Sequence, residues 1–131
     1  MTKLSKKAHR KDEHLALATA QYQPEQANDF DLLRLDRRAL PEASVQADIL
    51  QTEVFGQEIS APIYLNAITG GSPRGTQINH DLALVAQEQN IPLALGSASI
   101  VASEPATIAS FAIAREVNPE GVIYVNVNPD T

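Results

Sequence analysis

Three short apolar runs begin about thirty residues apart, and this repeat constrains the fold of the 131-residue chain more than any other sequence feature. The runs are Pro62–Asn66, Ile91–Gly96 and Gly121–Val127. Continuous apolar runs of this length are typical of parallel strands that are covered on both faces. We therefore expect three parallel strands, each joined to the next by a right-handed crossover.

A helix is predicted in the first interval between these runs. Within Pro73–Asn90, helical spacing predicts largely one stripe, formed by Ile78, Leu82, Val85, Ala86 and Gln89. Ser72 stands directly before a proline, which is the arrangement expected of an N-cap residue followed by the first helical position. The start of this helix is therefore well defined by the sequence.

The second interval and the first sixty residues carry shorter signals. A helix is predicted over Ala106–Val117, and another over Asp12–Ala20. An arginine-rich run covers Leu32–Leu40. A weak hairpin signal covers Thr52–Ile59, with its turn expected at Gly56-Gln57.

The order of predicted elements from residue 61 is β-α-β-α-β, which indicates the α/β class. A period of thirty residues fits both a TIM barrel and a doubly wound sheet, and the period alone does not separate them. We assign residues 1–60 to an N-terminal arm and extension, and residues 61–131 to about three βα units. A full barrel takes about 250 residues, so we expect this chain to be the N-terminal piece of something longer.

Basic residues are concentrated at the N-terminus. Half of the ten lysines and arginines precede residue 12, whereas residues 12–131 carry five arginines and sixteen carboxylates. Such an acidic body argues against nucleic-acid binding, because neutralising phosphates requires a basic surface. The arm is then either a solvated terminus or a clamp for an anion.

The amino-acid composition excludes several kinds of functional site. The chain has no cysteine, so disulfides, thiolate metal sites and cysteine nucleophiles are excluded. No apolar run approaches the roughly 18 residues of a membrane span, and the N-terminus lacks the apolar core of a signal peptide. We therefore expect a cytoplasmic protein without a membrane span.

Candidate ligand residues follow each predicted strand at its carboxyl end, where ligands bind in parallel α/β folds. Thr69, Gly70 and Gly71 follow the first strand, and the glycines would let the backbone approach a ligand. Ser97 ends the second strand and Asn126 lies near the end of the third. Each also has an ordinary structural explanation, respectively a tight turn, a small packing residue and a cap on the next loop.

The basic arm holds a second candidate group. If the arm is helical, Arg10, Lys11 and His14 share one face, which would suit a diphosphate. No set of His, Asp and Glu residues has convincing metal-ligand spacing, and neither a P-loop nor a nucleophile elbow is present.

Several of these segments, in this order and spacing, resemble type II isopentenyl-diphosphate isomerase along essentially the whole chain. The matching segments are Arg10-Lys11-Asp12-Glu13-His14-Leu15, Ala67-Ile68-Thr69-Gly70-Gly71, Gly96-Ser97 and Val125-Asn126. The resemblance implies a TIM barrel that uses reduced FMN to interconvert isopentenyl and dimethylallyl diphosphate. It further implies Mg²⁺ on the diphosphate and NADPH as a reductant of the flavin. We expect the protein to form a homo-oligomer.

The resemblance also implies roles for individual residues. The substrate diphosphate would be bound by Arg10, Lys11 and His14, with Ser97 nearby. The residues that would contact FMN are Ala67, Ile68, Thr69, Gly70, Ser97 and Asn126. No residue of this chain is expected to bind the metal directly.

This sequence departs from the family at two places. Ile68 stands where many members have methionine, a change that keeps apolar bulk. Ala98-Ser99 replaces the common Gln-Arg pair, which removes a cation and an amide expected at the substrate. The family's magnesium ligand, flavin-binding lysine and phosphate loops would fall beyond Thr131, so these 131 residues alone are expected to be inactive.

Two other functions fit the strand-end pattern. One is another FMN-dependent TIM barrel, such as a 2-hydroxy-acid oxidase, although the basic arm favours a diphosphate substrate. The other is a non-catalytic half barrel that serves as an oligomeric scaffold, with edge strands paired between chains.

Overall fold

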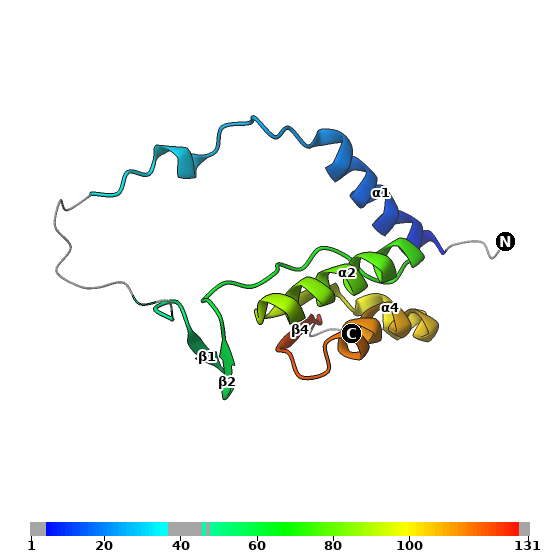
Figure 1. Cartoon of the computed structure of the whole chain (residues 1–131). Coiled ribbons are helices and arrows are strands. Elements are labelled where there is room, and N and C mark those ends of the chain that lie inside the picture. The colour runs from blue at the N-terminus through cyan, green and yellow to red at the C-terminus, as the bar shows by residue number, and fades with distance from the viewer. Residues whose placement is uncertain (1–4, 37–45, 47, 129–131) are drawn as a thin grey trace.

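The protein is a mixed α/β molecule in which α2 and α4 pack beside a small parallel sheet (Figure 1). The computed structural model describes residues 5–36, 46 and 48–128. Its helices are α1 (Lys6–Gln21), η1 (Asp29–Leu32), α2 (Pro73–Gln89), α3 (Ser99–Ser103), η2 (Pro105–Ile108) and α4 (Ala109–Val117), and its strands are β1 (Thr52–Val54), β2 (Gln57–Ile59), β3 (Leu93–Ser97) and β4 (Ile123–Asn126). The expected α/β class is confirmed at this level.

The three predicted parallel strands lie next to one another in sequence order. β3 pairs in parallel with β4, in the register Leu93↔Ile123 through Ser97↔Asn126 with a bulge between Leu95 and Ser97. The first apolar run is shorter than expected, because only Leu65 forms a parallel bridge with β3. Its carbonyl accepts from the Ala94 N–H at 2.8 Å and its N–H donates to Pro92 O at 2.9 Å.

α2 begins as predicted, and its buried face overlaps only part of the predicted stripe, at Ala86 and the partly buried Leu82. Ser72 is its N-cap, and the Ser72 hydroxyl accepts from the Gly75 N–H at 3.0 Å. The buried face is centred on Asn79 and Ala83, whereas Val85 of the predicted apolar stripe is 43% exposed. Small side chains occupy this face because α4 packs directly against it.

The predicted helix Ala106–Val117 is present as two consecutive segments, a 3₁₀ turn (η2) followed by α4, and α3 precedes them. α3, η2 and α4 follow one another, and Pro105 opens η2. Proline has no backbone N–H and cannot continue a helix that starts before it, so a new helical segment begins there. Regular α-helix resumes only at Ala109.

The core lies between α2, α4 and the helix side of the parallel sheet. Its buried apolar side chains are Ala8, Ala83, Ala86, Leu93, Leu95, Ile100, Phe111 and Ala114. One buried amide crosses this layer, because Asn79 Nδ2 donates to Ser110 O at 2.7 Å. That bond satisfies both groups and fixes α2 against α4.

The predicted hairpin is present, but its turn is one residue earlier than expected. β1 and β2 are antiparallel in the register Val54↔Gln57, so Phe55 and Gly56 form the turn. Both have positive φ, +52° and +78°, as the favoured two-residue hairpin turns require. The Phe55 ring lies edge-on to Tyr124 at a centroid distance of 6.0 Å, which links the hairpin to β4.

The N-terminal arm is helical over a longer stretch than predicted. α1 starts at Lys6, and the Ser5 hydroxyl caps it by accepting from the Ala8 N–H at 3.1 Å. Residues 37–40 of the predicted arginine-rich run lie outside the described residues. In the described part of the chain, no helix is both long and apolar enough to cross a bilayer.

Candidate functional site

Thr69 is the most unusual residue of the predicted site. It follows the first strand segment, is 1% exposed, and is the one described residue with a buried side-chain oxygen, Oγ1, that has no hydrogen-bond partner. A buried hydroxyl without a partner costs about 1–3 kcal/mol. Such a group is a natural contact for a ligand that supplies the missing partner.

The glycines near Thr69 are explained by close packing within the protein. A Cβ on Gly96 would lie 2.7 Å from Thr69 O, so β3 can approach this segment only without a side chain. A Cβ on Gly70 would overlap the Phe111 ring. Gly71 has φ +85° and donates its N–H to the Ser110 hydroxyl at 2.6 Å. The turn is therefore rigid, and a ligand role for Gly70 stays a prediction.

The ends of the second and third strands are brought together as expected. Ser97 and Asn126 are register partners, and the Ala98 N–H donates to Asn126 O at 2.8 Å. The Ser97 hydroxyl donates to Ser99 Oγ at 3.1 Å, a contact within the same loop. The Asn126 side chain is exposed.

The face of the parallel sheet opposite α4 carries Asn126 at its carboxyl end. Val125 faces Phe111 of α4, and side chains alternate along a strand, so Tyr124 and Asn126 lie on the opposite face. The Tyr124 ring contacts Phe55 at 6.0 Å and Tyr64 at 6.3 Å, so aromatic rings pack on the middle of that face. Ile68 and Asn126 are exposed, and Ala67 is half-buried. These residues offer both apolar and polar surface, which suits a planar aromatic ligand.

The basic residues of the arm form a continuous stripe along α1. Lys7, Arg10, Lys11 and His14 are spaced at i, i+3, i+4 and i+7, and we call them the basic stripe. Lys7 is not among the predicted site residues, although its helical spacing from His14 could have indicated it. Its ammonium group donates to Ser103 Oγ of α3 at 2.9 Å.

The arm lies at the same end of the molecule as the Thr69 turn. α1 is placed beside the first turn of α2 (Figure 1), where Ser72 Oγ donates to Asp12 Oδ1 at 2.6 Å. Ala8 is 4% exposed and belongs to the core. Ala8 and Asp12 therefore dock α1 against the body of the molecule, whereas Arg10 and His14 are exposed, and the anion clamp stays a prediction.

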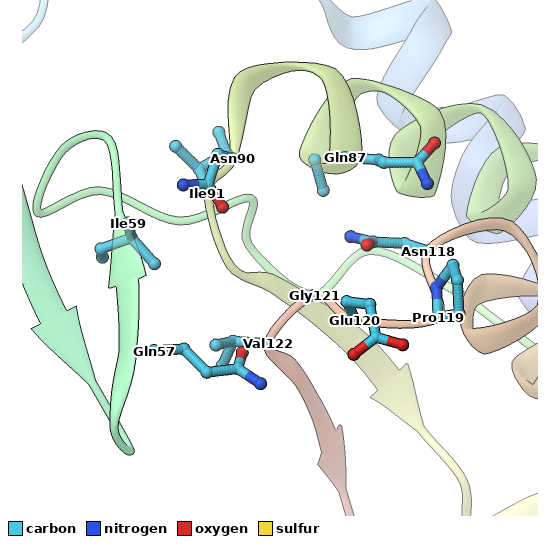
Figure 2. Close-up of a pocket in the computed structure, with 11 residues that line it drawn as sticks. Gln57, Ile59, Gln87, Asn90, Ile91, Asn118, Pro119, Glu120, Gly121 and Val122 are labelled. Atoms are coloured by element: carbon cyan, nitrogen blue, oxygen red, sulfur yellow. The ribbon is translucent and has the colours of Figure 1, made fainter.

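A separate pocket of about 190 Å³ lies at the amino ends of β3 and β4 (Figure 2). It contains none of the predicted site residues, and its lining includes Gln57, Gln87, Asn90, Asn118 and Glu120. Ligand sites in parallel α/β folds lie at the opposite, carboxyl ends. We therefore do not assign this pocket to the candidate site.

The described residues offer no group of three or more His, Asp or Glu side chains that could hold a metal ion. One carboxyl group is perturbed on the surface of α2. Hydrogen bonds from His80 and Gln77 hold the pKa of Asp81 below its usual value. Asp81 is exposed and distant in sequence from the strand ends, so we read it as a local helix contact.

Comparison with curated proteins finds relatives named isopentenyl-diphosphate delta-isomerase. The chain is 39% identical over 125 residues to that protein of Latilactobacillus sakei subsp. sakei, a match covering 95% of this chain and 36% of the relative. It is 40% identical over 121 residues to the proteins of the same name from Listeria welshimeri and Staphylococcus haemolyticus. Each of these matches covers 92% of this chain and 34% of the relative. The chain thus spans about a third of the length of these relatives. No profile of a known protein family matches it.

Proposed function

We propose that this chain supplies part of the flavin and diphosphate sites of an FMN-dependent, type II isopentenyl-diphosphate isomerase. The observation that carries the proposal is the identity of about 40% across nearly the whole chain to proteins named isopentenyl-diphosphate delta-isomerase. The fold proposed for the whole enzyme is a TIM barrel, of which residues 61–131 would form the first βα units. The parallel, sequential order of the described strands supports this.

Dependence on FMN is supported by the chemistry of the strand ends. The orphaned Thr69 hydroxyl lies in the turn after the first strand segment, directly after the exposed Ile68, and Asn126 is exposed at the end of β4. An isoalloxazine ring has an apolar face, which can cover Ile68, and a polar edge, which can form hydrogen bonds with Thr69 and Asn126. The residues present therefore fit a flavin.

Each of these residues has a defined task in the proposed reaction. When bound and reduced by NADPH, FMN would supply the proton-transfer chemistry of a 1,3-allylic shift. Ala67 and Ile68 would exclude water from the ring, and Thr69, Ser97 and Asn126 would orient it through hydrogen bonds. Gly70 keeps the turn close to the core.

The basic stripe would hold the diphosphate. Arg10, Lys11 and His14 carry donors that form charge-assisted hydrogen bonds with phosphate oxygens, and holding the diphosphate would fix the alkene in place. The described residues do not fit a Mg²⁺ site. We therefore assign no step to the metal, whose ligands would belong to another part of the enzyme.

The test uses the protein expressed from its complete reading frame. We expect a yellow protein whose FMN spectrum bleaches with NADPH, and which converts isopentenyl diphosphate to dimethylallyl diphosphate only when flavin and Mg²⁺ are present. Conversion by a flavin-free protein would contradict the type II assignment. Oxidation of a 2-hydroxy acid without isomerisation would place the protein among other FMN barrels.

A further inference from the structure

α1 is held against the rest of the molecule by one side of the helix. Ala8 is buried in the core, and Asp12, one turn later, forms the 2.6 Å hydrogen bond with Ser72. On the adjoining side, Lys7 reaches Ser103 of α3. The orientation of α1 about its own axis is therefore set by very few contacts.

We propose that Asp12 is a positioning residue, whose hydrogen bond to Ser72 is a latch that fixes the orientation of the basic stripe relative to the body of the molecule. The orienting role depends on the proposed function, because it assumes that the stripe binds a diphosphate. The latch itself is a structural statement that stands independently of the substrate.

Ser72 is a rigid point of attachment for α1. Its hydroxyl donates to Asp12 Oδ1 and at the same time accepts from the Gly75 N–H at 3.0 Å, so it serves α1 and the cap of α2 together. It also directly follows Gly71, whose N–H is bound to Ser110. A movement of α1 at this contact would disturb the turn that carries Thr69.

The contact with Ser72 favours a carboxylate at position 12. A hydroxyl that donates to an ionised oxygen at 2.6 Å forms a charge-assisted hydrogen bond, which is roughly twice as strong as a neutral one. The carboxylate also lies at the N-terminus of α2, where the helix dipole stabilises negative charge. Asp12 is thus held by two effects that an amide or an apolar side chain would not reproduce in full.

The direction of the basic stripe depends on how α1 is rotated about its own axis. Successive residues on a helix are rotated by about 100°, so a roll of α1 would change the direction in which the whole stripe points. Lys7, at the start of the stripe, contacts Ser103 at the end of α3. The latch therefore holds the stripe in one fixed orientation beside α3.

The test combines proteolysis with anion binding in the full chain. Trypsin cuts after the lysines and arginine of the stripe, and its rate follows the population of undocked arm when closing is fast. We expect Asp12→Ala to raise cleavage after Lys7, a bond that Asp12 does not adjoin and whose Ala8 is buried in the docked arm, about tenfold, the change expected for loss of a hydrogen bond to a charged group. We also expect a similar rise in the Kd for inorganic pyrophosphate. Mass spectrometry identifies the cleavage position.

Three matched variants separate the latch from other effects. Glu13→Gln removes a neighbouring carboxylate that is exposed and should leave both readouts within twofold. Asp12→Asn, which keeps an acceptor oxygen, should fall between the unaltered chain and Asp12→Ala. Ser72→Ala loses both the cap and the latch, so Asp12→Ala added to it should cause a further change of less than about fivefold, the part that comes from the helix dipole.

The outcomes discriminate between the latch and the proposed function. Equal cleavage of Asp12→Ala and Glu13→Gln, or a further tenfold rise for Asp12→Ala in the Ser72→Ala background, would overturn the latch. Increased cleavage with unchanged pyrophosphate affinity would overturn the orienting role. If the unaltered chain does not bind pyrophosphate, the proposed function fails together with the orienting role, whereas the cleavage data still decide the latch.

Discussion

At the scale of single residues, Thr69 shows how a cost to stability can indicate a binding site. Its hydroxyl is buried without a partner, although the neighbouring hydroxyl of Ser110 is fully used between Gly71 and Thr107. An apolar side chain of the same shape would remove the cost of the unpaired group. The presence of threonine here is best explained by a partner that the bound ligand supplies.

Replacing Thr69 by valine should therefore change stability and flavin binding in opposite directions. We expect Thr69→Val to stabilise the ligand-free protein by about 1 kcal/mol, because an unsatisfied buried hydroxyl is removed, and to weaken FMN binding. Thermal unfolding and flavin titration measure the two effects. Thr107→Val is the control, because Thr107 Oγ1 already donates to Glu104 O at 2.7 Å and its loss should destabilise. A Thr69→Val protein that is less stable and binds FMN normally would contradict this reading.

The basic stripe predicts a different kinetic effect from the flavin residues. We expect Arg10→Ala to raise the KM for isopentenyl diphosphate about tenfold or more with unchanged FMN content, since a charge-assisted contact contributes about 1.5–3 kcal/mol. Arg34→Ala is the matched control, because it removes the same charge from the N-terminal arm and extension at an exposed position outside α1. Equal KM values for the two variants would show that only the overall charge of the arm matters.

At the scale of elements, the close approach of β3 to the first strand segment depends on Gly96. We expect Gly96→Ala to destabilise the protein by about 1–3 kcal/mol, because the new Cβ would meet backbone atoms that cannot rotate away. Urea unfolding measures the change. Ala94→Ser, a small change on the open side of the same strand, should cost less than about 0.5 kcal/mol. Similar unfolding of the two variants would mean that the close approach is not needed.

Elements could be predicted where the local chemistry of the chain decides them. Ser72 followed by proline marks the start of α2, and continuous apolar runs mark β3 and β4. Elsewhere, tertiary packing decides which residues of an element are buried. Asn79 is buried because Ser110 O accepts its amide, a partner 31 residues away that periodicity cannot reveal.

The same limit applies to the candidate site. The strand-end residues could be predicted because parallel strands place their carboxyl ends together. The contact between Asp12 and Ser72 could not, because it joins residues 60 apart in the chain. The missing partner of Thr69 also depends on three-dimensional packing, since the sequence shows only a threonine before two glycines.

At the scale of the whole molecule, an apolar surface is left uncovered on the helix side of the sheet. A cavity of about 510 Å³ lies there between α4 and β4, and its lining includes Leu95, Phe111 and Ile123. Around it, Ile108 and Val127 are 57% and 68% exposed. Among the described residues, β4 pairs only with β3, so its other edge is free as well. Exposed apolar patches and free strand edges both favour association.

This surface predicts how the 131-residue chain behaves when expressed by itself. The proposed barrel would cover it with further βα units, whereas the isolated chain leaves it in water and should self-associate. We expect Ile108→Lys combined with Val127→Lys to shift the chain toward monomer in sedimentation velocity experiments, because two charges would be buried in any association through this face. Leu17→Lys with Tyr22→Lys is the control, since both residues are exposed on α1 or at its end, outside the cavity. The same two-residue change in the complete protein should prevent folding, because there the face would be internal. If the complete protein folds with both lysines, the barrel proposal is contradicted. That result would mean that this face is exposed to solvent in the whole enzyme, as it is in the single chain.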